Sequence, residues 1–101
     1  MKPMFALLAV LASGSAFGAC NNAHLPQTPS IPDGLSASFE EMKQAREDVA
    51  GYVKGAEAYL ECVKPNAMMH NYVVSRIERT AETFNAERRE FLQRQEAVAS
   101  N

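Results

Sequence analysis

The chain has 101 residues, with ten lysines and arginines against twelve aspartates and glutamates, a net charge of −2 and two cysteines. A chain of this length forms at most one small domain, and such domains commonly need a disulfide, a metal or a partner subunit for stability. Its acidic and basic side chains alternate, and Arg88-Arg89 lies between two glutamates. The sequence therefore has no basic stripe of the kind that binds nucleic acid.

Residues 1–18 have the pattern of a cleaved signal peptide. Lys2 precedes an unbroken apolar run over residues 5–12, and small residues flank Phe17. This is the order of charged, apolar and cleavage regions in a secretory leader. The apolar run is far shorter than the ~20 residues that cross a bilayer. We expect export to the periplasm or the medium, cleavage near Gly18 or Ala19, and no membrane span.

Residues 17–20 also resemble a bacterial lipobox, with Phe17 where leucine is usual. In that alternative, Cys20 becomes the lipidated first residue of an outer-membrane lipoprotein. Lipidation of Cys20 would leave Cys62 without a partner in an oxidising compartment. A soluble periplasmic protein is the favoured interpretation, and a lipid anchor at Cys20 is the alternative.

Residues 19–37 form a proline-rich arm. The prolines recur every third residue, which is the period of a polyproline II helix, and the same period places a second set of residues on one edge. The two sets are Pro26, Pro29 and Pro32, and Leu25, Thr28 and Ile31. Residues 31–34 read as a β-turn with proline second and glycine fourth. An ordered arm and a disordered polar tether are both open interpretations.

The first helix is expected over residues 38–64. Ser38 and Glu41 match a capping box at its start, and Pro65 ends the pattern. Between them, apolar residues recur at alternating steps of three and four, as in a coiled-coil seam. The seam consists of Met42, Ala45, Val49, Tyr52, Ala56, Tyr59 and Val63.

The second helix is expected over residues 66–98, with Asn66 as its cap. Its seam is Val74, Ile77, Ala81, Phe84, Arg88, Phe91, Gln95 and Val98. A connection of two or three residues makes the helices antiparallel neighbours. The predicted fold is therefore all-α, an antiparallel two-helix hairpin over residues 38–99 with the proline-rich arm packed along the first helix. Four flanking apolar residues need cover from the arm or from a second copy: Val53, Leu60, Val73 and Leu92.

Small residues form a stripe along the first helix that ends at Cys62. The stripe is Gly51, Gly55, Ala58 and Cys62, and we interpret it as the groove that receives the arm, although the glycines are also explained if the helix merely tolerates them. The ~36 Å from the helix start to Cys62 matches the ~34 Å that the arm spans in polyproline II form. We therefore predict a Cys20–Cys62 disulfide, which would contribute ~4 kcal/mol on the chain-entropy model.

No catalytic constellation is present in the sequence. His24 and His70 stand without an acid and a nucleophile at a recognisable spacing, so we predict neither an enzyme nor a cofactor. The cluster of Cys62, Met68, Met69 and His70 has the soft ligands that suit Cu(I). Methionine at helical spacing is more often part of a core, and the disulfide already occupies Cys62, so we predict no metal site.

Several short motifs resemble those of a group of small exported proteobacterial proteins with no assigned function. The motifs are Ile31-Pro32-Asp33-Gly34, Glu41-Met42, Tyr59-Leu60-Glu61-Cys62, and Phe84-Asn85 with Arg88 and Phe91. The resemblance covers about residues 31–94, and it implies export but no activity.

The leading functional hypothesis is an exported structural or protein-interaction module. Its partner, an unknown protein or a second copy, would meet the end of the second helix at Phe91, Leu92 and Val98. Two alternatives stay open: an envelope-stress or chaperone-like helical protein, and the lipoprotein anchored through Cys20. The identity of the partner, the oligomeric state and the biological process are not determined by the sequence.

Overall fold

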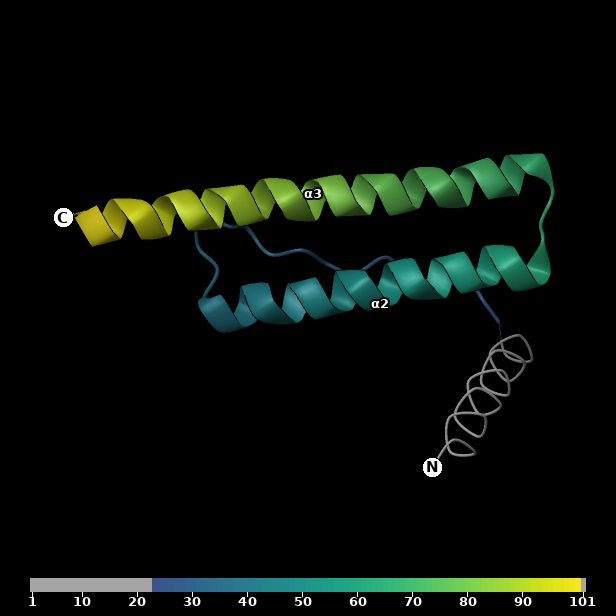
Figure 1. Cartoon of the computed structure of the whole chain (residues 1–101), viewed down its shortest axis with the longest axis horizontal. Helices are drawn as coiled ribbons and strands as arrows, with labels where there is room; N and C mark the ends of the chain where they lie inside the picture. Colours follow the sequence, from purple (N-terminus) through teal and green to yellow (C-terminus); the bar gives the residue numbers. More distant parts are fainter. Residues whose placement is uncertain (1–22, 101) are drawn as a thin grey trace, which may run out of the picture.

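The computed structural model describes residues 23–100; the predicted signal peptide, its cleavage site and Cys20 lie outside them. Two helices, α2 (Phe39–Val63) and α3 (Ala67–Ser100), pack side by side as an antiparallel hairpin (Figure 1). The prediction of an all-α hairpin is confirmed. At 1.5 Å per residue α3 is ~51 Å long and α2 ~38 Å, so the C-terminal turns of α3 extend beyond the start of α2, as Figure 1 shows.

The start of α2 is fixed by a reciprocal pair of hydrogen bonds. The Glu41 amide donates to Ser38 Oγ at 3.1 Å, and the Ser38 amide donates to Glu41 Oε1 at 2.8 Å. This is the predicted capping box, in which two amides that lack helical partners are satisfied together. The helix therefore begins where the sequence places it, directly after the arm.

The connection between the helices is short because both of its ends are capped. Lys64 adopts a left-handed conformation (φ 51°), and its amide donates to the Leu60 carbonyl. Pro65 follows, and Asn66 Oδ1 then accepts a hydrogen bond from the Met69 amide at 2.9 Å. A left-handed residue ends a helix, and an asparagine side chain starts one. Residues 64–66 thus reverse the chain.

The core lies along the line where α2 and α3 meet. On α2 the buried residues belong to the predicted seam: Met42, Ala45, Val49, Tyr52 and Ala56. On α3 the buried residues are Val73, Thr80, Phe84 and Phe91. The predicted seam is correct at Phe84 and Phe91 but wrong by one residue at two other positions. Val73 and Thr80 are buried there, in place of the predicted Val74 and Ala81. The buried side of α3 is turned towards the arm.

Residues 23–37, the described part of the arm, run without helix or strand up to a turn at residues 34–36 and contribute side chains to both halves of the core. Ile31 packs against the cluster that contains Val49 and Phe84, and Leu25 packs against the cluster around Ala56. In Figure 1 this segment passes between the helices and approaches α3 before it descends to the start of α2. The hairpin therefore has a third layer on one face.

The turn that ends the arm differs from the expected one. Asp33 begins it: the Asp33 carbonyl accepts from the Ser36 and Ala37 amides, and the Asp33 side chain accepts from the Leu35 amide. The turn thus lies two residues later than the predicted Ile31–Gly34 turn. The reason is that an aspartate side chain stabilises a turn beginning at its own residue.

This turn is attached to α3 rather than to α2. The Gly34 amide donates to Glu87 Oε1 at 2.8 Å. The Arg94 guanidinium donates to the carbonyls of Leu35 and Ala37 and stacks 5.2 Å from the centre of the Phe91 ring. Hydrogen bonds from a charged group are stronger than neutral ones. The turn before α2, at the start of the hairpin, is thereby bonded to the C-terminal half of α3.

Gly34 is required by this contact, whereas Gly51 is not required by any. A Cβ on Gly34 would lie 1.9 Å from the Glu87 carbonyl oxygen, but a Cβ on Gly51 would have no neighbour within 4 Å. We expect Gly34→Ala to destabilise the fold by roughly 2 kcal/mol or more, because the turn must leave α3. Gly51→Ala, the matched control, should stabilise it by up to ~1 kcal/mol through helix propensity. Urea unfolding followed by circular dichroism measures both, and equal effects would contradict the packing described.

Candidate functional site

The two faces of the hairpin differ in what covers them. On one face, the arm lies over α2 residues such as Gly55 and over α3 residues such as Arg76. On the opposite face, among residues 23–100, no segment lies over the junction of α2 and α3. We call the uncovered face the open face. Its groove has Phe39, Lys43, Arg46, Arg88 and Leu92 among its lining residues. The helix period of 3.6 residues places Val53, Glu57, Leu60 and Glu61 on the same flank of α2, and Val74 and Ala81 on the same flank of α3.

A groove of about 290 Å³ opens on the open face near the start of α2. Its floor is apolar and belongs to the core, because Met42, Phe84 and Phe91 are buried. Its rim carries two large apolar side chains that remain in solvent, Phe39 at 66% and Leu92 at 42% exposure. Exposed apolar side chains gathered around a groove are typical of an interaction surface.

The groove is also basic. Lys43, Arg46 and Arg88 line it, and no acidic residue does. Within residues 23–100 these three side chains form no hydrogen bond or ion pair with the rest of the chain. In a chain with a net charge of −2, these charges are free to meet acidic groups on a partner, where they would favour encounter and orientation.

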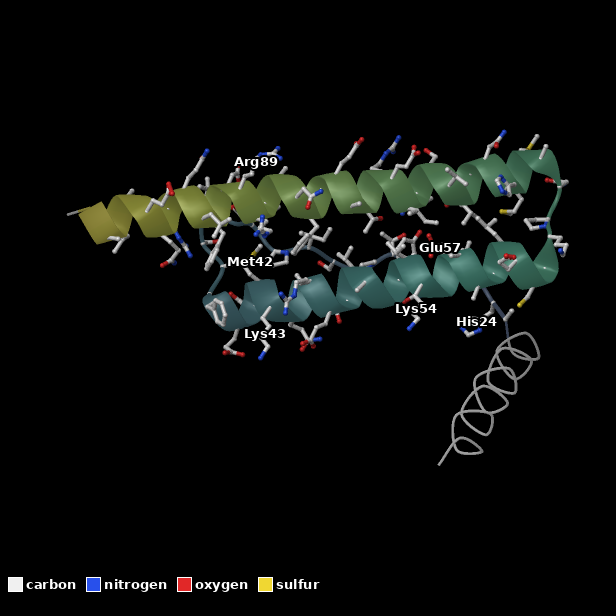
Figure 2. The ribbon with its side chains drawn as sticks, in the orientation of Figure 1. His24, Met42, Lys43, Lys54, Glu57 and Arg89 are labelled. Carbon is white, nitrogen blue, oxygen red and sulfur yellow. The ribbon has the colours of Figure 1, made fainter. Side chains whose placement is uncertain are left out.

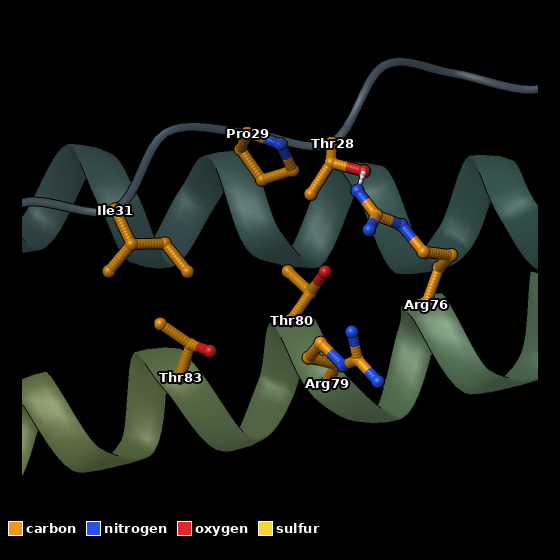
Figure 3. Close-up of a pocket in the computed structure, with 7 residues that line it drawn as sticks. All are labelled: Thr28, Pro29, Ile31, Arg76, Arg79, Thr80 and Thr83. Carbon is orange, nitrogen blue, oxygen red and sulfur yellow. Dashed lines mark hydrogen bonds between the residues drawn. The ribbon is translucent and has the colours of Figure 1, made fainter.

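A second, smaller cavity of about 210 Å³ lies on the other face, between the arm and α3. Figure 3 shows Thr28 and Ile31 of the arm directed towards α3, with the Arg76 guanidinium donating to Thr28 Oγ1. Thr80 is buried in the α3 wall of this cavity. This cavity is a gap between the arm and α3, and the hydrogen bond from Arg76 to Thr28 fixes the position of the arm along α3.

Three carboxylates gather where the turn meets α3. Asp33, Glu87 and Glu90 have oxygens within 4.8 Å of one another. The hydrogen bond and the charge of Glu87 raise the pKa of Glu90, and burial and the charge of Asp33 raise it further. Close carboxylates disfavour each other's ionised form. The repulsion therefore lies mainly within α3, between Glu87 and Glu90, and the Asp33 carboxylate of the turn adds to it, whereas Arg89 offsets part of it.

The small residues predicted to form a groove for the arm do not all contact it. Gly55 meets the arm, since its Cβ would lie 3.1 Å from Pro26 Cγ. Gly51 faces solvent, and Ala58 is half-buried. The described residues contain no free cysteine, and Cys62 is half-buried. Its predicted partner Cys20 lies outside the described residues, so the pairing stays a prediction.

The residues predicted as a partner surface do not share one role. Phe91 is buried at 6% exposure and contributes to the groove floor, while Leu92 lies on the rim. Val98 is 68% exposed on the overhanging end of α3. The cluster of Cys62, Met68, Met69 and His70 lies near the connection, where Met68 is 82% exposed. Among residues 23–100, the group of histidine, cysteine and acidic side chains close enough to share a metal is the carboxylate cluster, not Cys62 with His70.

Sequence reasoning missed the residues of α3 that hold the arm. Glu87 and Arg94 bond the turn, and Thr80 is buried in the wall of the cavity beneath the arm. These three residues recur at steps of seven, in line with the buried Val73. A spacing of seven keeps residues on nearly the same helix face. That signal was present, but polar residues on a helix are normally read as a solvated face.

The chain matches no protein-family model, no curated protein and no solved structure. The resemblance to small exported proteobacterial proteins therefore stays a prediction. None of the described helices is long and apolar enough to cross a membrane.

The carboxylate cluster predicts a pH-dependent stability. Because the pKa of Glu90 is raised in the folded protein, the folded state binds more protons, so stability falls as pH rises above the usual range for glutamate. Glu90→Gln should therefore raise the melting temperature at pH 7, and the difference should vanish below about pH 4. Glu82→Gln, an exposed glutamate on the same helix outside the cluster, is the control. A Glu90→Gln variant that melts at or below the wild-type temperature at pH 7 would refute this.

Proposed function

We propose that this chain is an exported protein-interaction module whose open face is its docking surface. The observation that carries the proposal is the asymmetry of the hairpin. One face is covered by the arm, and the other combines an apolar groove with three cationic side chains that have no partner within the described residues. No described feature favours catalysis over binding.

The arm, in this proposal, is a strap along the first helix that a Cys20–Cys62 disulfide secures. Pro32 shares a cavity with Ala45, and Pro26 lies against Gly55. Six arm residues thus advance along ten residues of α2, or ~2.5 Å per arm residue at 1.5 Å per helical residue. The remaining ~10 Å from Gly55 to Cys62 needs about four more arm residues, which leads to position 22. Cys20 is then within reach of Cys62.

The intact mass of protein purified from the envelope of bacteria expressing the full chain tests the strap and the leader together. Removal of a leader near Gly18 or Ala19 shortens the chain, and a disulfide removes two hydrogens that reduction restores. A lipid at Cys20 would instead add the mass of a diacylglycerol or more and leave the Cys62 thiol to react with alkylating reagents. That result would replace the strap by the lipoprotein alternative.

The docking surface is tested by placing a photo-reactive amino acid at single positions in the producing bacterium. Leu92 lies on the groove rim, and Glu47 is an exposed α2 residue that lines neither cavity. We expect a discrete protein adduct from position 92, at least several-fold above that from position 47, because hot-spot residues lie inside an interface. Equal labelling from the two positions, or no adduct from either, would contradict the proposed function.

A further inference from the structure

We propose that the partner of the open face is a second copy of this chain, packed antiparallel so that two hairpins form a four-helix bundle. This inference rests on the proposed function, and it names the partner of the same surface. Its basis is the order in which charged and small residues follow one another along the open face.

The charges on the α2 flank of the open face change sign along the helix. Lys43 and Arg46 line the groove near the start of α2. Glu57 follows Arg46 by eleven residues, which is close to three full turns, and Glu61 follows Lys43 by eighteen, which is five full turns. Each acid therefore lies on the same line of the helix surface as its base, ~16 Å and ~27 Å further along.

A single two-fold axis brings both pairs together. In an antiparallel arrangement, residues pair around the position midway between them, and the midpoints of 46 with 57 and of 43 with 61 both fall at about residue 52. Arg46 of one copy then meets Glu57 of the other, and Lys43 meets Glu61. Each contact across a two-fold axis occurs twice. The dimer therefore has four pairs of opposite charge, two on each side of the axis.

The same axis matches the apolar residues of the open face. Tyr52 and Ile77 belong to one core cluster, so residue 52 of α2 lies at about the level of residue 77 of α3. Val74 and Ala81, both half-buried, are centred on that level. Val74 of one copy therefore meets Ala81 of the other, so a larger side chain can fit beside a smaller one where the ridges of one helix enter the grooves of the next.

Two lines of charged residues run along this flank of α2. Lys43 and Lys54 both point away from α3 in Figure 2, whereas Glu57 is on the side of α2 nearer to α3. Arg46 shares the line of Glu57, so Arg46 with Glu57 is the pair nearer to the middle of the face, and Lys43 with Glu61 lies at its outer edge, on the line that also carries Lys54. The face has the length of α2, ~38 Å, and the width of two helices, ~20 Å. About 750 Å² per copy is close to the ~800 Å² per partner of a stable protein interface. The open face is thus large enough to hold a dimer.

Charge exchange tests the dimer, with protein from cells that express the full chain. Arg46→Glu and Glu57→Arg each create two like-charge contacts across the axis, and each should weaken the dimer at least ~tenfold in sedimentation equilibrium. The double variant restores opposite charges across the axis and should return the dissociation constant to within about threefold of the original. Glu82→Lys, at an exposed α3 residue that does not line the groove, is the control, with no more than about a threefold change. Circular dichroism verifies that each variant is helical.

A monomer at ~100 μM, or single and double variants that dissociate alike, would overturn the second copy as partner. The photo-crosslinks then separate this failure from that of the proposed function. An adduct from position 92 with a protein of another mass would leave the docking surface in place with a different partner. An adduct of twice the mass of the chain, lost in Arg46→Glu and regained in the double variant, supports the dimer.

Discussion

The packing of residues 23–37 against both helices is the contact on which the rest of this structure depends. Two helices alone share a single line of contact, and the core residues of this hairpin would be open to water on both sides. Leu25 and Ile31 close one side, while Arg94 and Glu87 of α3 hold the turn from which α2 begins. A thin core gains most from each additional apolar side chain that it buries. The arm therefore acts as a third element of the core.

Because the arm covers one face of the hairpin, the two faces differ in composition and exposure. With the arm on one side, the apolar side chains of the opposite side, from Phe39 to Leu92, have no cover within the described chain. Their groove is bordered by cations, and the acidic residues of the same flank lie further along α2. Amphipathic helices commonly bind with their apolar face in a hydrophobic groove of a partner, and the proposed dimer is an arrangement of that kind. The arm covers the two-helix core on one face, and the proposed dimer would cover it on the opposite face.

The hairpin could be predicted from the sequence because its signals are local. The capping box of Ser38, the break at Pro65 and the spacing of Met42 to Ala56 each act within a few residues, and each is present in the structure. The α3 seam was less accurate, because the burial of Thr80 and the roles of Glu87 and Arg94 depend on an arm that lies more than 45 residues away in sequence. The open groove was only partly anticipated: Leu92 was named, but Phe39, Lys43 and Arg46 approach it from the other helix.

The position of the arm is tested most directly by nuclear Overhauser effects between Pro26 and Gly55. Pro26 Cγ lies where it would approach a Gly55 Cβ at 3.1 Å, so the ring protons of Pro26 and the α-protons of Gly55 must be close in space. We predict a strong cross-peak between them, together with dispersed chemical shifts for residues 23–37. Averaged shifts for this segment and no cross-peak would contradict the account, because the arm would then lie in solvent and leave both faces of the hairpin open.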